Sequence, residues 1–439
     1  MSLTAQPQNY NLKEIAGQYK NEQAVMLNSS DRLVIDFDKN NNLQVTNHHY
    51  HDVYFTGINS KLSADEYLSY SSFEKLNDIE AYLYQYYAKH YKKQKITEMV
   101  NNDDFSNSVF YDDRKSMRVV FPQVNEGSYT SISYSETYSD VHLCRNLFFL
   151  SSYLPIVNSQ LSVEFPENVN IHYTLLNDKG NIRFSEQKKG KKIIYTWKAE
   201  KVDNYDRREE DFSITYYEPH IVLYVSDYTV NGKKTNVFNN INGFYDWYWS
   251  LIKDVNKEPV PELKTLVDSL CRDKKTELEK AKAIFYWVQS NIKYVAFEAG
   301  YSGLVPRHAK DIFKNRYGDC KDMSSLQKMM YDYAGLKSHL VCVGTRDIPY
   351  KFSELPTVSV FNHMIAHVEI EGREYFTDGT AFFIPIDLPS DAIQGKEALV
   401  VDGEKFRIKT IPVIDKEKNG KDDTLWLTIN ADTLKGTSH

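Results

Sequence analysis

The 439 residues include 53 lysines and arginines and 60 aspartates and glutamates, which gives a formal net charge of −7. This balance, with no clustered basic stripe, argues against a nucleic-acid partner. No long uncharged apolar run is present, so no transmembrane segment is expected, and the length leaves room for two or three domains.

The first segment, residues 1–29, is interpreted as an N-terminal extension. It has no basic stretch followed by an apolar core, so it does not have the pattern of a signal peptide. The four cysteines of the chain are widely spaced and form no CxxC pair, which indicates neither a zinc site nor a dense disulfide framework, although one bridge remains possible. They are Cys144, Cys271, Cys320 and Cys342. We expect no metal and no cofactor.

Residues 30–245 predict an antiparallel β-sandwich. In residues 31–55, Asp38, Lys39 and three asparagines separate two β-rich runs, which indicates a hairpin. The same alternation of β-rich runs and turn residues recurs in residues 116–138, 159–176 and 181–202. One helical insert is predicted between Ser63 and Lys95.

The histidine cluster NHHYH, Asn47 to His51, lies within the second run of the first hairpin. Strand alternation places His49 and His51 on one face and His48 on the other. No carboxylate pattern accompanies the cluster, so we do not expect it to bind a metal.

Residues 246–402 predict an α+β core. Apolar residues recur at helical spacing from Leu263 to Cys271, and Thr276 with Glu279 forms a capping box for the next helix. A third helix is expected to begin after Asp319 and to end at Gly335. Strand-like runs follow at residues 338–345, 363–370 and 373–380. Residues 403–439 are interpreted as a linker and the start of a truncated C-terminal β-domain.

Cys320 is the candidate nucleophile of this core. It lies in the first turn of the third helix, where unpaired backbone N–H groups and the helix dipole favour a thiolate. Asp319 and Asp322 act in the opposite sense, and Lys321 partly offsets them. A small buried cysteine at a helix start is the competing interpretation.

A hairpin supplies the candidate base. The dipeptide Glu371–Gly372 is a plausible two-residue turn, and counting outward from it places Ile365 opposite Asp378. His363 and His367 are then both diagonal neighbours of Asp378 on one sheet face. An aspartate beside a histidine fixes its tautomer and stabilises its imidazolium. Periodicity alone does not choose between the two histidines.

Three segments resemble the Cys, His and Asp segments of the transglutaminase-like superfamily: RYGDCKD, FNHMIAHVEIEG and EYFTDGT. The resemblance is closest to a bacterial branch with an N-terminal β-sandwich of unknown role. It implies a papain-like fold with the triad Cys320, His363 and Asp378, and the pair Asn362–His363 selects His363. As a family tendency it also implies export to the periplasm or cell surface.

The function that this resemblance implies is acyl transfer by a cysteine nucleophile, either amide hydrolysis or transfer to an amine. The expected substrate is a peptide, protein or glycopeptide. The backbone N–H of Cys320 would help to hold the oxyanion, and a second donor is expected between Tyr294 and Leu304. Tyr301 is a candidate, although a loop tyrosine is more often structural. The alternative function is a catalytically silent scaffold that acts as a surface glycan- or protein-binding module.

Overall fold

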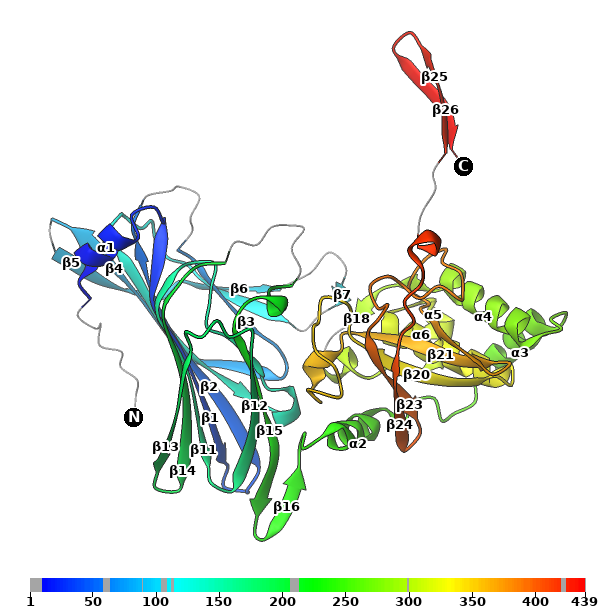
Figure 1. Ribbon diagram of the computed structural model, residues 1–439, viewed down its shortest axis with the longest axis horizontal. Coiled ribbons are helices and arrows are strands. Elements are labelled where there is room, and N and C mark those ends of the chain that lie inside the picture. Colours follow the sequence, from blue (N-terminus) through cyan, green and yellow to red (C-terminus); the bar gives the residue numbers. More distant parts are fainter. Residues whose placement is uncertain are drawn as a thin grey trace.

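The computed structural model describes residues 10–57, 64–88, 90–103, 109–111, 114–205, 213–297, 300–419 and 424–438. A β-rich part comes first, an α+β part follows, and a two-stranded hairpin stands apart at the end of the chain (Figure 1). The predicted fold class, a β-sandwich followed by an α+β core, is confirmed. Among the described residues, no helix is both long enough and apolar enough to cross a membrane.

An eight-stranded sheet dominates the β-rich part. Every neighbouring pair in it is antiparallel except β1 and β11, which run parallel. In spatial order the strands are β13 (Arg183–Lys189), β14 (Lys192–Val202), β11 (Ile156–Pro166), β1 (Ala24–Phe37), β2 (Leu43–Phe55), β9 (Tyr129–Tyr138), β4 (Glu74–Tyr87) and β5 (His90–Ile96).

Smaller sheets cover this large one. The first contains β10 (Leu147–Phe149), β15 (His220–Val230), β12 (Val169–Leu176) and β16 (Lys233–Asn236), and the second contains β3 (Glu66–Tyr70), β8 (Lys115–Val119) and β6 (Met99–Asp103). Trp197, Phe165 and Ile221, each at most 2% exposed, belong to the core between the large sheet and the first small sheet. Burial of apolar side chains on both inner faces is what holds a sandwich together.

The helical insert predicted between Ser63 and Lys95 is wrong, because the described residues of this segment form β3, β4 and β5. In β4 the buried Ala81 and Leu83 alternate with the half-buried Tyr82 and Tyr84. A period of two, together with the strand preference of tyrosine, overrides the helix-forming character of the charged residues.

Two of the four predicted hairpins are confirmed. Strand β1 pairs with β2, and β13 pairs with β14. By contrast, β8 and β9 belong to different sheets, as do β11 and β12. The turn residues in these two segments reverse the chain between the layers of the sandwich, so the local signal was correct but the partner strand was not.

The α+β part contains one five-stranded sheet covered by helices. Its strands, in spatial order, are β22 (Arg373–Thr377), β21 (His363–Ile370), β20 (Lys337–Val343), β23 (Glu397–Asp402) and β24 (Lys405–Thr410). The helices are α2 (Ile241–Ile252), α3 (Pro261–Cys271), α4 (Glu277–Asn291), α5 (Ala309–Asn315) and α6 (Cys320–Tyr333), and a short α1 (Leu12–Gln18) precedes the sandwich. Apolar residues of α3, α4 and α6 pack on Ala366, Val368 and Ile370 of β21.

Local sequence patterns correctly predicted a helix start and a hairpin turn in the α+β part. The capping box of Thr276 and Glu279 is present at the start of α4. The two-residue turn is also present: Ile370 pairs with Arg373, and Glu371 and Gly372 both have positive φ, 50° and 79°. Two positive φ angles in succession are what a type I′ hairpin turn requires.

The two parts of the chain meet through α2 and the short pairing of β18 (Ala296–Phe297) with β7 (Val109–Tyr111). Phe244 and Tyr248 of α2, neither measurably exposed, join one apolar cluster with Phe148 of the sandwich and Cys342 of the core sheet. One continuous buried cluster therefore spans the sandwich and the core.

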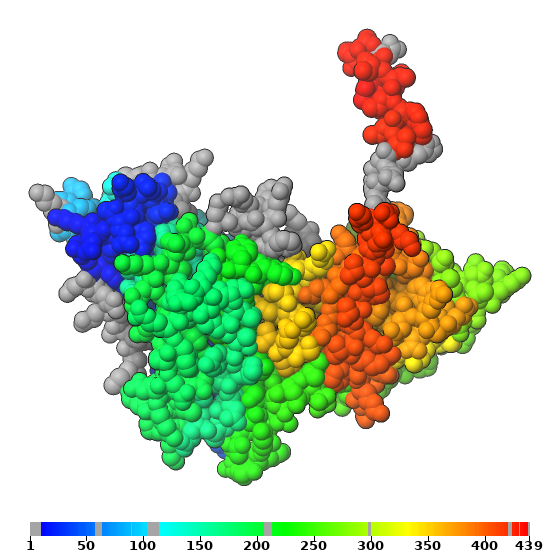
Figure 2. Space-filling model, in the orientation of Figure 1, coloured from blue at the N-terminus to red at the C-terminus, as the bar shows by residue number. Residues whose placement is uncertain are grey.

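The last two strands, β25 (Leu425–Asn430) and β26 (Thr433–Ser438), form a hairpin that projects from the core (Figure 2).

A short parallel pairing lies beside the start of α6, where β17 (Lys293–Tyr294) pairs with β19 (Tyr317–Gly318).

A buried ionic network explains the histidine cluster of β2. The imidazole of His49 contacts Asp31 at 2.5 Å and Glu136 at 2.9 Å, from the two neighbouring strands. The carboxylates that the sequence did not show beside His49 are thus supplied by β1 and β9. Burial lowers the pKa of His49, but its hydrogen bonds to Asp31 and Glu136 outweigh burial and raise this pKa to about 9.

We expect Asp31→Asn to destabilise the protein in a pH-dependent way. The folded pKa of His49, about 9, lies above its ordinary value of 6.5, so its contribution is complete below pH 6.5 and is lost as the pH rises through 9. The loss of unfolding free energy should therefore be about 3 kcal/mol below pH 6.5 and should shrink towards pH 9. Urea unfolding at several pH values measures it. The exposed Glu80→Gln serves as control, and a pH-independent loss would refute the assignment.

Candidate active site

Cys320 is the first residue of α6, as the cap at Asp319 predicted. The Asp319 carboxylate accepts hydrogen bonds from the backbone N–H groups of Lys321 and Asp322, at 3.1 and 3.3 Å. The Asp322 carboxylate accepts one in return from the Asp319 N–H at 3.2 Å. This reciprocal capping box holds the first turn of the helix, and with it the position of the sulfur.

A second contact fixes the same turn from outside. Asp322, which is completely buried, accepts hydrogen bonds from the backbone N–H of Arg307 at 2.8 Å and from its guanidinium at 2.9 and 2.5 Å. Gly318 allows this arrangement, since a Cβ there would lie 2.6 Å from the Cβ of Asp322. From the sequence, Asp322 was expected only to disfavour the Cys320 thiolate, and no pattern indicated Arg307 as its partner.

His363 and Asp378 lie together at the other side of the site. The His363 Nε2 and the Asp378 Oδ2 are 2.9 Å apart, and Thr380 donates to Asp378 through its N–H at 3.0 Å and its hydroxyl at 2.6 Å. Both members of the pair are largely buried, with side chains 15% and 4% exposed. The D-G-T sequence, an Asp that accepts from the residue two positions on, is a turn signal from which Thr380 could have been anticipated.

The charge of this pair follows from its surroundings. Burial lowers the pKa of His363, but the charge and hydrogen bond of Asp378, followed by contact with Cys320, raise it to about 10. For Asp378, burial raises the pKa, yet His363 and Thr380 lower it below its ordinary value. The pair is therefore an imidazolium and a carboxylate near pH 7, with the Cys320 side chain in contact with the imidazole.

His367, which periodicity could not exclude, does not join this site. It is fully buried and its ring lies 5.5 Å from that of His339, centroid to centroid. Of the two histidines on this strand, the structure brings only His363 to Asp378.

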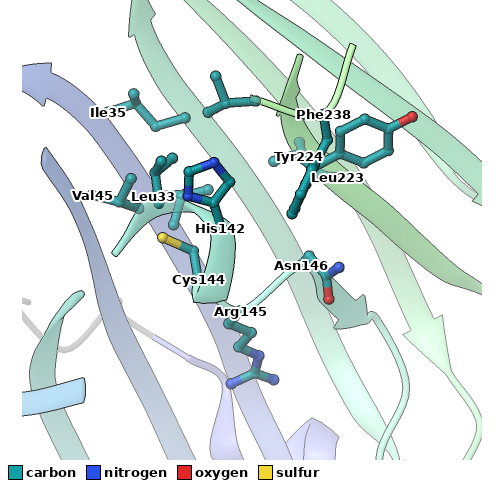
Figure 3. A pocket seen from close by; sticks show the side chains of 12 residues that line it. Leu33, Ile35, Val45, His142, Cys144, Arg145, Asn146, Leu223, Tyr224 and Phe238 are labelled. Atoms are coloured by element: carbon teal, nitrogen blue, oxygen red, sulfur yellow. The ribbon is translucent and has the colours of Figure 1, made fainter. Parts of the chain in front are cut away.

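The other three cysteines lie in unreactive surroundings. Burial raises the pKa of Cys342 to about 12 and also raises those of Cys271 and Cys144. Figure 3 shows Cys144 beside Arg145 in the lining of a small cavity within the sandwich, and its thiol donates to the backbone carbonyl of Asp140. All four cysteines are free thiols.

Tyr301, the candidate second oxyanion donor, has another partner. Its hydroxyl donates to the Asp140 carboxylate in the sandwich, and its ring meets that of Phe73 edge-on at 5.0 Å. Tyr301 thus ties the loop before the Cys320 helix to the sandwich, as expected for a structural loop tyrosine.

A cysteine at a helix start beside a buried His–Asp pair is an arrangement typical of papain-like cysteine proteins. The sequence profile described as the transglutaminase-like superfamily matches residues 264–377, which include Cys320 and His363. A second profile, described as a domain of unknown function with a solved structure (DUF3857), matches residues 56–205. Over residues 264–377 the core of this chain is therefore similar to the transglutaminase-like superfamily.

Comparison with solved structures supports the fold assignment. A "putative protease" from Parabacteroides distasonis ATCC 8503 is 14% identical, with a TM-score of 0.66, over 89% of this chain and 72% of that one. This likeness shows a shared fold that extends through both the sandwich and the core.

Two further structures are similar at lower scores. A "putative cysteine protease" from Cytophaga hutchinsonii is 11% identical over 80% of this chain and 97% of its own, with a TM-score of 0.25. A structure described as a TGase is 13% identical over 53% of this chain and 54% of its own, with a TM-score of 0.23. The search of curated proteins found no match.

Proposed function

We propose that this protein is a cysteine-nucleophile acyl-transfer enzyme that acts on the amide bonds of peptides, proteins or glycopeptides. The observation that carries the proposal is the hydrogen-bonded His363–Asp378 pair beside Cys320 at the start of α6. The three residues come from the three segments whose order and spacing resemble the superfamily.

In the proposed reaction, His363 takes the proton of Cys320, and the resulting thiolate attacks the amide carbonyl and forms a tetrahedral oxyanion, which the Cys320 N–H at the helix start helps to hold. His363, held protonated by Asp378, gives its proton to the departing amine as the C–N bond breaks. The resulting thioester is then cleaved by water or by an amine, from which His363 accepts a proton. Nothing in the site favours water over the amine.

The test is the rate at which iodoacetamide alkylates Cys320 at about pH 6, followed by mass spectrometry. A free thiol with a pKa of about 8.5 reacts slowly there, so Cys320 should react at least tenfold faster than Cys271, the half-buried cysteine of α3. His363→Ala should remove this advantage, and the exposed His172→Ala should leave it unchanged.

A second measurement separates reactivity from turnover. Wild type and Cys320→Ala are incubated with a mixed peptide library, with and without a primary amine, and new amino termini, ammonia and amine adducts are counted. If Cys320 reacts no faster than Cys271 and His363→Ala changes nothing, the catalytic proposal is wrong and the silent-scaffold interpretation replaces it.

A further inference from the structure

A second histidine pair lies on the core sheet, outside the candidate active site. His339 of β20 and His367 of β21 are directly paired across the two strands. Their side chains are 6% and 0% exposed. Ala366, Val368 and Ile370 alternate with this position and pack on the helices, so His367 lies on the opposite sheet face.

These imidazoles have nitrogens without hydrogen-bond partners. Within the described residues, both ring nitrogens of His367 and the Nε2 of His339 are buried and accept or donate no hydrogen bond, while the Nδ1 of His339 contacts the carbonyl of Val401 at 3.0 Å. A buried polar atom without a hydrogen-bond partner destabilises the folded protein unless a ligand satisfies it. Neutral imidazole is the form that binds metal ions.

Carboxylates complete the cluster. One ligand atom each from His339, His367 and Glu369 lie within 4.8 Å of one another. An oxygen of Glu374, on the paired strand β22, lies 3.4 Å from the Nε2 of His367. Two imidazoles with carboxylates are a donor set typical of Zn²⁺.

We propose that His339, His367 and Glu369, with Glu374 as the fourth ligand, form a binding site for a divalent transition-metal ion, Zn²⁺ in the first place. Zinc bonds of about 2.0–2.2 Å place tetrahedral ligands about 3.3 Å apart, so the side chains must draw together by about 1.5 Å. Rotation about the long Glu369 and Glu374 side chains, which are partly exposed, accommodates this change.

The metal must compete with cations that already contact the carboxylates. Lys337 contacts Glu369 at 2.9 Å, Lys409 contacts Glu374 at 3.1 Å, and Arg407 contacts both, at 3.2 and 3.5 Å. Lys337 and Lys409 are 61% and 37% exposed, so both can turn to water at little cost, whereas Arg407 is 29% exposed and competes more strongly. A zinc–ligand set of two imidazoles and two carboxylates outweighs that cost.

The position of this site suggests what the metal does. The strand that carries His367 begins at His363, and β22, which carries Glu374, ends directly before Asp378. A four-ligand site with no open position is structural rather than catalytic. A metal there would clamp three strands and so stabilise the hairpin that holds the His–Asp pair.

The experiment uses the full chain with Cys320→Ala, because Cys320 and His363 could themselves bind zinc. Metal-free protein is dialysed against Zn²⁺ and the bound metal is measured, and Co²⁺ is added separately to record the visible spectrum of a tetrahedral site. We expect one equivalent of Zn²⁺, an increase in melting temperature and a tetrahedral Co²⁺ spectrum. His367→Ala and Glu369→Gln should each weaken binding at least tenfold, and the exposed His172→Ala should not.

A further variant distinguishes a metal site from an ordinary ionic cluster. Arg407→Gln removes a cation that competes for both carboxylates, so zinc should bind more tightly to it. Glu369→Gln changes a partly exposed group, which keeps the test valid should His367→Ala fail to fold. No stoichiometric zinc, binding that survives both ligand changes, or weaker binding in Arg407→Gln would each overturn the proposal.

Discussion

Asp378→Asn is expected to lower kcat of the proposed reaction by about 10⁴-fold. The carboxylate of Asp378 holds the His363 ring at 2.9 Å and supplies the charge that overcomes the effect of burial on the imidazole. An asparagine keeps the shape but provides no charge, and its amide can stabilise the wrong tautomer. The measurement is kcat on any substrate that the peptide screen identifies, together with the alkylation rate of Cys320.

The same variant has a readout that needs no substrate. In the wild type, the imidazole of His363 should titrate near pH 10, since Asp378 raises its pKa. With the carboxylate gone, burial still lowers this pKa and only Cys320 still raises it, so the pKa should fall well below 10. NMR of the histidine ring follows this directly. An unshifted titration in Asp378→Asn would show that Asp378 does not control His363; Asp268→Asn, at an exposed ion pair of α3, is the matched control.

The candidate site could be predicted from the sequence because its parts are local. Asp319 marks a helix start, and Glu371–Gly372 marks a turn, and each fixes the residues beside it whatever the rest of the chain does. The choice between His363 and His367 could not be made in this way, since strand alternation places both on one face. The structure separates them by their neighbours, Asp378 for the first and His339 for the second.

Features that depend on pairing between distant strands were not predictable. The carboxylates around His49 come from β1 and β9, and the four proposed metal ligands come from β20, β21 and β22. No sequence spacing indicates the carboxylates around His49 or the proposed metal ligands, because strand order and register bring these residues together. The segments that turn between sheets, near Glu167 for example, were misassigned for the same reason: a turn residue reverses the chain without choosing its next partner.

Asp322→Ala is expected to cost about 3 kcal/mol of unfolding free energy and to lower the rate of the proposed reaction by about 10²-fold. Asp322 accepts hydrogen bonds from the guanidinium and N–H of Arg307 and from the N–H of Asp319. Its removal leaves these donors without their acceptor at a buried position and frees the turn that positions Cys320. Urea unfolding and Cys320 alkylation measure the two effects. Asp268→Asn, in an exposed pair with Lys264 on α3, should change stability by no more than about 0.5 kcal/mol.

A double-mutant cycle with Arg307→Ala tests the cause. Arg307 is 27% exposed, so its guanidinium can turn to water, whereas Asp322 has no exposure at all. Arg307→Ala should therefore lower the free energy of unfolding by more than the removal of one partner of an exposed ion pair does, because it leaves the buried Asp322 carboxylate with fewer hydrogen-bond donors. The double variant should cost less than the sum of the two single changes by about 1–3 kcal/mol. If the two costs simply add, Asp322 does not act through Arg307, and the capping bond to Asp319 alone must hold the start of α6.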